Sequence, residues 1–187
     1  MFRSIVSGVL LAAALFPAAH ASTDWVVDRA ASNVGFEYRM EGAPTEGLFH
    51  EFTGSGTFDP AAPDAARFEI RIKSKSIDLH NFLASGFATS AEWFDSKNHP
   101  DVVYELTDLK PLGDNRYAAS GSISIRGRTK TLNSEIALTV GKADAKASGV
   151  LTIRRTDFLL GVGPSSALVD IGPDVLVRFS LVARPGG

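Results

Sequence analysis

Apolar and polar residues alternate along most of the chain, and this period of two is the strongest constraint on its fold. In residues 33–40 the even positions are apolar or aromatic, and the odd ones are Asn, Gly, Glu and Arg. The alternation returns at 68–73, 122–126, 136–140 and 175–181. It is typical of strands that have one buried and one solvated face.

Turn residues separate these runs, as at Gly113-Asp114-Asn115 and Gly172-Pro173-Asp174. Short strands with turns between them predict a β-sandwich or a β-barrel. The chain has 187 residues, with no repeat of about 20–50 residues and no low-complexity linker. We therefore expect residues 22–187 to form a single domain.

One segment departs from the strand pattern. Within residues 81–97, Leu83, Phe87, Ala91 and Phe94 follow helical spacing. Pro100 disfavours a helical residue before it, so the segment must end by that point. We expect a helical insertion at 81–97, formed by one helix or a pair of short turns.

The first 21 residues have the features of an export signal. Arg3 precedes an apolar run at 5–16, which is too short to span a bilayer, and small residues follow at Ala19 and Ala21. We expect cleavage after Ala21 and a periplasmic or secreted mature protein. No later stretch is apolar enough for a spanning helix.

Composition excludes several classes of function. There are no cysteines, so disulfides, thiolate nucleophiles, cysteine zinc sites and iron–sulfur clusters are excluded. The formal net charge of −2 provides no positive field to hold a polyanion, so nucleic acid is not an expected partner.

Motifs for catalysis and metal binding are incomplete. His50, His80 and His99 lack a second ligand at metal spacing, and Gly163-Pro164-Ser165-Ser166-Ala167 fails the nucleophile-elbow pattern at its last position. Asp78, Glu92 and Asp95 are interpreted as solvated acids. We expect no catalytic residue, no metal and no cofactor.

Two charged turns have competing interpretations. Arg126-Gly127-Arg128-Thr129-Lys130 is either a solvated hairpin tip or a polar mouth that meets a headgroup or a membrane surface. Arg154-Arg155-Thr156-Asp157-Phe158 predicts a structural ion pair around a turn.

Ten of the 12 phenylalanines follow residue 22, which fits either a packed core or an apolar cavity.

Several segments together resemble the YceI-like family of secreted, lipocalin-like barrels, over residues 25–183. The segments are Trp25-Val26-Val27-Asp28, Ser32-Asn33-Val34-Gly35-Phe36, Gly47-Leu48-Phe49, Phe52-Thr53-Gly54, Thr57-Phe58-Asp59-Pro60, Ser76-Ile77-Asp78, Glu92-Trp93-Phe94-Asp95, His99-Pro100, Ile125-Arg126-Gly127-Arg128-Thr129-Lys130, Arg155-Thr156-Asp157-Phe158 and Ile171-Gly172-Pro173-Asp174-Val175.

The resemblance implies an eight-stranded antiparallel barrel with a helical insertion. It also implies an apolar interior that holds a polyisoprenoid, an isoprenoid quinone or a similar long-chain lipid without catalysis. The chain departs from the family pattern at Ala31, where members commonly have histidine. It departs again at 84–88, where an Arg-Asp-x-His-Leu run is replaced by Ala-Ser-Gly-Phe-Ala.

We therefore expect a lipid carrier whose binding site is lined by residues that point inward. The expected lining comprises Phe36, Tyr38, Phe52, Phe58, Phe68, Ile70, Phe82, Phe87, Phe94, Tyr104, Phe158 and Phe179. Transient membrane contact and a homodimer are both compatible with the sequence.

Two alternatives stay open. One is an interaction module with a packed interior, whose partner binds outside at the 126–130 turn. The other is an enzyme acting on a lipid or quinone, such as a hydrolase that uses Asp78, Asp95 or a histidine.

Overall fold

A computed structural model describes residues 23–164 and 168–186, and the expected export signal lies outside them. The described residues form one antiparallel sheet of 11 strands. In chain order the strands are β1 (Thr23–Val27), β2 (Asn33–Met40), β3 (Ala43–Phe49), β4 (Phe52–Phe58), β5 (Arg67–Lys73), β6 (Ile77–Asp78), β7 (Asp101–Gly113), β8 (Arg116–Ile125), β9 (Arg128–Val140), β10 (Ala145–Arg154) and β11 (Ile171–Pro185).

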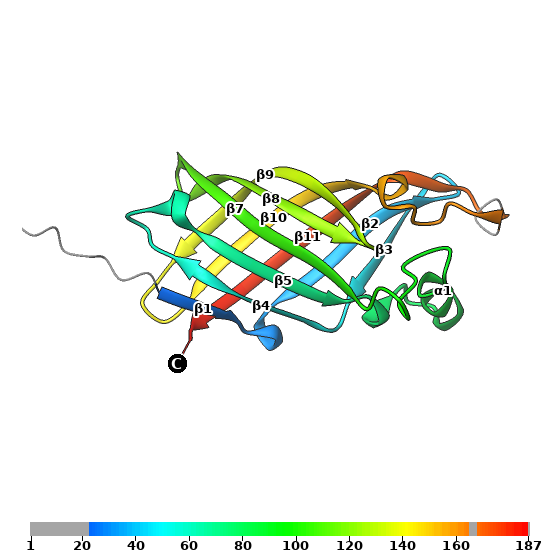
Figure 1. Ribbon diagram of the computed structural model, residues 1–187, viewed down its shortest axis with the longest axis horizontal. Helices are drawn as coiled ribbons and strands as arrows, with labels where there is room; N and C mark the ends of the chain where they lie inside the picture. The colour runs from blue at the N-terminus through cyan, green and yellow to red at the C-terminus, as the bar shows by residue number, and fades with distance from the viewer. Residues whose placement is uncertain (1–22, 165–167, 187) are drawn as a thin grey trace, which may run out of the picture.

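The sheet closes on itself. Around the ring the order is β1, β4, β5, β7, β8, β9, β10 and β11, and β11 pairs with β1 to complete it. Every pairing in the ring is antiparallel (Figure 1). The eight-stranded antiparallel barrel implied by the family resemblance is confirmed.

Three short connections between strands interrupt the barrel wall side by side. β1 leads to β2 through a 3-10 turn at Arg29–Ala31, β3 leads to β4 through His50 and Glu51, and β5 leads to β6 through a 3-10 turn at Ser74–Ser76. Hydrogen bonds link the breaks, because Arg29 Nη1 donates to the His50 carbonyl at 2.8 Å and the His50 amide donates to the Ser76 carbonyl at 3.1 Å. Beyond the breaks, β2, β3 and β6 extend the wall at one end of the barrel.

The expected insertion is present, but its regular helix is shorter than 81–97. Helix α1 covers Phe82–Ala88, and the Asn81 side chain caps it by accepting from the Leu83 and Ala84 amides, each at 3.0 Å. The Thr89 hydroxyl donates to the Gly86 carbonyl at 2.7 Å, and turns follow. Glycine, serine and threonine are weak helix formers, which accounts for the early end.

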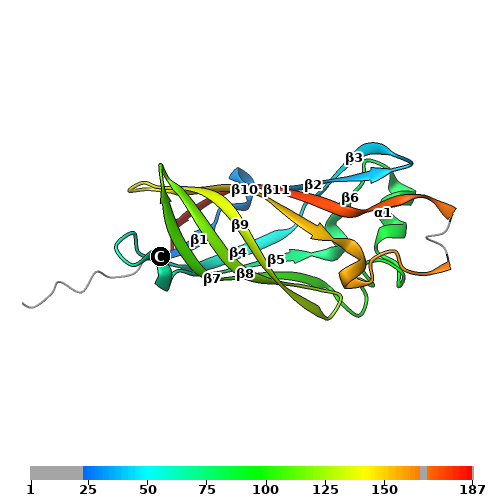
Figure 2. The ribbon, with the colours of Figure 1, turned by 90° about the horizontal axis from the view of Figure 1, so that it is seen from above.

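The two ends of the barrel differ. Figures 1 and 2 show α1, the β2–β3 hairpin and the segment before β11 gathered at one end, and the C-terminus at the other. At the C-terminal end a cluster of buried side chains closes the interior; its members are Trp25, Phe58, Ala66, Leu109, Ala119, Ala145 and Ala183. In the described parts of the chain, no helix has the length and apolarity that crossing a bilayer requires.

Candidate functional site

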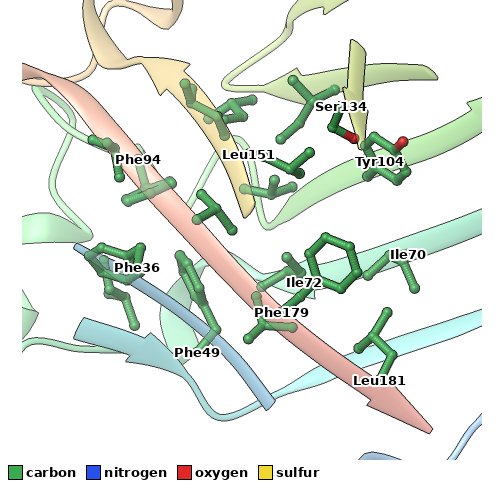
Figure 3. A pocket seen from close by; sticks show the side chains of 18 of the residues that line it. Phe36, Phe49, Ile70, Ile72, Phe94, Tyr104, Ser134, Leu151, Phe179 and Leu181 are labelled. Carbon is green, nitrogen blue, oxygen red and sulfur yellow. The ribbon is translucent and has the colours of Figure 1, made fainter. Parts of the chain in front are cut away.

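The barrel contains an apolar cavity of about 670 Å³. This volume falls within the range of about 300–1,000 Å³ typical of small-molecule sites. Its walls carry aromatic and aliphatic side chains that point inward. Those labelled in Figure 3 include Phe36, Phe49, Ile70, Ile72, Leu151, Phe179 and Leu181 from the strands and Phe94 from the insertion. Such walls exclude water and favour an apolar ligand.

Most of the residues expected to line the interior do so. Nine of the twelve line the cavity, namely Phe36, Tyr38, Phe58, Phe68, Ile70, Phe87, Phe94, Tyr104 and Phe179. Their contact with a ligand stays a prediction.

The other three lie elsewhere. Phe52, at the start of β4, is 4% exposed and packs in a cluster with Val34 and Phe49. Phe158 is 2% exposed in the 3-10 turn at Arg155–Phe158 and packs in a buried cluster with the cavity-lining residues Val102 and Ile153. Phe82, the first residue of α1, is 91% exposed. Phe52 follows the strand alternation, since it pairs with the cavity-lining Ile72, but it is packed in its cluster and does not line the cavity. Strand alternation does not apply in a 3-10 turn or in a short helix, which accounts for Phe158 and Phe82.

Other lining residues were missed, although some had a signal. Ala145, Ala147, Leu151 and Ile153 of β10 line the cavity at alternate positions, which the period of two predicts. Leu83 of α1 also lines it, one helical turn before Phe87, as the shared helical spacing of these two residues indicates.

The cavity opens at the end that carries the insertion. Met40, Leu83, Phe87 and Val169 line the cavity and are also 38%, 78%, 46% and 40% exposed. We call these four residues, with the neighbouring exposed Phe82 and Leu168, the mouth rim. The rim is apolar and solvent-exposed, a combination that marks a ligand entrance or an interaction surface.

Two hydrogen bonds fix part of this rim. The Glu41 amide donates to the Asp170 carbonyl at 2.8 Å, and the Asp170 amide donates to the Glu41 carboxylate at 2.8 Å. The β2–β3 hairpin, which carries Met40, is thereby joined to the segment that carries Leu168 and Val169.

Arg155 organises the wall below the rim. Its guanidinium donates to four backbone carbonyls, those of Leu160 at 2.7 Å, Gly161 at 3.0 Å, Ile171 at 2.6 Å and Gly172 at 2.9 Å. Burial lowers the pKa of this guanidinium. The expected ion pair at this turn is wrong for Arg155, because carbonyl groups take its donors, and Arg154 instead pairs with Asp174 at 3.9 Å.

Arg126 has a similar role. Its guanidinium donates to the Leu159 carbonyl and, at 2.5 Å, to the Ala91 carbonyl, which joins the β8–β9 turn to the insertion. Arg128 and Lys130 are exposed. The basic turn is therefore divided between a structural arginine and two solvated cations.

The candidate catalytic groups lie apart from the cavity lining. His50 Nε2 and Asp78 Oδ2 are 3.0 Å apart beside a shallow surface hollow, and this hydrogen bond lowers the pKa of Asp78. The nearby Ser76 and Ser85 hydroxyls donate to the Lys73 and Asn81 carbonyls, not to His50. Among residues 23–164 and 168–186, no cluster of three His, Cys, Asp or Glu side chains is placed to hold a metal.

The departures from the family pattern can be placed in the structure. Ala84, Phe87 and Ala88 present apolar groups to the cavity. Ser32, which follows Ala31, accepts from the Val182 amide at 2.9 Å and donates to the Asp28 carbonyl at 2.7 Å. The apolar residues at 84–88 therefore make the cavity wall at the mouth more apolar. Ser32, next to Ala31, contributes to barrel closure through its hydrogen bonds.

Comparisons with known proteins agree with this architecture. A UPF0312 protein of Pseudomonas aeruginosa is 26% identical over 184 residues, which cover 91% of this chain and 95% of the relative. The crystal structure of BcnA from Burkholderia cenocepacia has a TM-score of 0.77 and 29% identity, covering 83% of this chain and 98% of BcnA. A polyisoprenoid binding domain from Saccharophagus degradans, implicated in plant cell wall breakdown, has the same fold, with a TM-score of 0.71 at 14% identity and coverage of 87% and 98%.

The match to a family is more extensive than any short motif. The sequence profile of the YceI-like domain matches residues 25–183, which include every strand from β2 to β10 and most of β1 and β11. The chain belongs to the YceI-like family.

Proposed function

We propose that this protein binds a polyisoprenoid, an isoprenoid quinone or a similar long-chain lipid inside the barrel, and that it sequesters or carries the lipid without transforming it. The observation that carries the proposal is the apolar cavity, which is closed at one end by the cluster around Trp25 and open at the mouth rim. A site of this shape encloses an elongated apolar molecule and leaves one end accessible.

Burial supplies the driving force. At about 0.8 kcal/mol for each methylene removed from water, a chain of roughly fifteen carbons gains on the order of 12 kcal/mol before ordering costs. Membership of the YceI-like family and the similar fold of a polyisoprenoid binding domain support this class of ligand. A cavity of this size also argues against an interaction module with a fully packed interior.

The proposal includes the compartment in which the protein acts and the route by which a lipid enters the cavity. Cleavage after Ala21 would release the mature protein into the periplasm or the medium. The mouth rim would then contact a membrane surface transiently, so that a lipid passes from the bilayer into the cavity without crossing water. Phe82 and Leu168, 91% and 83% exposed, are the side chains best placed to enter the bilayer interface.

Native mass spectrometry of the mature protein tests the proposal, with solvent extraction to identify any bound molecule. We expect a stoichiometric long-chain lipid. An apoprotein that also refuses added long-chain lipids would overturn the proposal and favour a partner that binds on the outer surface.

A further inference from the structure

Four residues with hydroxyl groups line the otherwise apolar cavity, namely Tyr38, Thr57, Tyr104 and Ser134. Of these, Tyr104 and Ser134 come from the two strands that flank β8. Tyr104 projects inward from β7 and Ser134 from β9, and both line the cavity (Figure 3). Tyr104 lies on the insertion side of Leu109, a member of the buried cluster that closes the C-terminal end, and Ser134 pairs with Ala119 at the edge of the same cluster. A polar group at this depth is surrounded by hydrocarbon.

Gly121 lets the two hydroxyls approach the same region. It lies on β8, between the strands that carry Tyr104 and Ser134. A Cβ at Gly121 would come within 2.9 Å of the Tyr104 phenol oxygen and 3.0 Å of its ring. The tyrosine therefore extends across β8 toward β9, which only a residue without a side chain allows.

Neither hydroxyl has a hydrogen-bond partner among residues 23–164 and 168–186. Burial raises the pKa of Tyr104, so its phenol remains a protonated donor at neutral pH. A polar group in apolar surroundings without a partner is unfavourable, and a ligand that supplies the partner relieves this.

The charges near the cavity favour a neutral partner. Among the described lining residues, Arg155 is the single charged side chain, and four backbone carbonyls occupy its donors. An ionised headgroup at the depth of Tyr104 would lose its hydration without gaining a counter-ion.

We propose that Tyr104 and Ser134 form a polar subsite that hydrogen-bonds an uncharged oxygen of the ligand, a hydroxyl or a carbonyl, inside the barrel. This inference rests on the proposed lipid binding and narrows it to long-chain lipids with a neutral oxygen-bearing group that enters the cavity. A pure hydrocarbon would leave both hydroxyls unpaired, and a charged headgroup would remain at the mouth.

The test compares phytanol with phytane, which share a carbon skeleton and differ by one hydroxyl. Binding is followed by the fluorescence of Trp25 and Trp93, which both line the cavity. We expect the preference for phytanol over phytane to fall about tenfold in Tyr104→Phe and in Ser134→Ala. Tyr117→Phe and Ser148→Ala, which remove hydroxyls outside the cavity lining, should retain the wild-type preference.

The outcomes separate the two proposals. If both probes bind and the preference is the same in wild type, Tyr104→Phe and Ser134→Ala, the polar subsite is overturned and lipid binding stands. If neither probe binds wild type, the proposed function is overturned as well. Phytanic acid, ionised at pH 8, should bind equally to wild type and Tyr104→Phe, and a tenfold loss would overturn the restriction to neutral groups. Thermal melts of the two variants confirm that they are folded.

Discussion

The guanidinium carbon of Arg155 lies 5.6 Å from the centre of the Trp93 ring. This cation–π contact joins the end of β10 to the insertion between β6 and β7. The same guanidinium binds the carbonyls of Leu160 and Ile171, so one side chain links three segments that surround the cavity near its opening. The shape of the opening therefore depends on an arginine whose hydrogen bonds, within the part of the chain that the structure describes, go to backbone carbonyls and not to a carboxylate.

Replacing Arg155 should destabilise the barrel. In Arg155→Met four carbonyls lose their donor, and we expect the free energy of unfolding to fall by roughly 2–4 kcal/mol in urea titrations. The stability of Arg155→Lys should lie between those of wild type and Arg155→Met, because a lysine ammonium cannot reproduce the planar fork of the guanidinium. Arg154→Met, which removes an exposed pair 3.9 Å from Asp174, should change stability by less than about 0.5 kcal/mol. Equal effects at 154 and 155 would contradict the structural role of Arg155.

Phe87→Asp should abolish lipid retention and leave the barrel folded. Phe87 lines the cavity and is 46% exposed, so a carboxylate there disrupts the apolar entrance while remaining hydrated. Val150→Asp is the matched control, since Val150 has the same exposure and is not among the cavity-lining residues. Lipid content after extraction is the measurement. Unchanged content in Phe87→Asp would remove Phe87 from the site.

Membrane contact should depend on the mouth rim. We expect the double variant Phe82→Ser with Leu168→Ser to lose most of its flotation with vesicles of phosphatidylethanolamine and phosphatidylglycerol, because two exposed apolar side chains no longer enter the interface. Leu112→Ser removes a 49% exposed leucine at the opposite end of the barrel and should float as wild type does. Equal flotation of all three proteins would rule out the rim as the contact surface.

The seam between β1 and β11 should weaken in acid. Asp28 accepts from Arg184 Nε at 2.9 Å, and this hydrogen bond is the main cause of the lowered pKa of Asp28; partial burial opposes it, and the Ala31 and Ala30 amides assist it. Because the pKa is lowered in the folded protein, the ionised carboxylate stabilises the fold at pH values above its ordinary pKa of 3.8. This contribution disappears as the pH falls through the folded-state pKa.

Melting curves from pH 7 to about pH 2 check this expectation. Asp28→Asn should melt below wild type at neutral pH, and the gap should close in acid because both side chains are then neutral. Asp114→Asn, in the β7–β8 turn, should show no comparable trend. A gap that stays constant down to the lowest pH would contradict a role for the charge of Asp28.

Alternation predicted the strand-borne part of the cavity well. Phe36, Phe68, Ile70 and Phe179 point inward because side chains of a strand alternate between its two faces. The same rule did not place Phe82, whose direction depends on where a short helix docks. The docking follows from contacts between distant segments, such as Arg126 with Ala91, which no local pattern contains.

Arg155 shows a second limit of the sequence. A charged residue next to Asp157 suggests an ion pair, but the structure gives its donors to carbonyls that become available only when the segments after it fold back. The inward direction of Tyr104, by contrast, follows from the strand alternation. That its hydroxyl has no hydrogen-bond partner within 23–164 and 168–186 becomes apparent only from the surrounding walls.

The pairing of β1 with β11 has a consequence for folding. Trp25 pairs with Pro185, so the ring joins two strands that are far apart in the sequence. Hairpins such as β7–β8 need only local contacts, but the interior stays open to water until β11 pairs with β1. Contacts between such distant segments make folding slow, and the unclosed strands expose apolar faces in the meantime. These faces are covered only when β11 closes the ring.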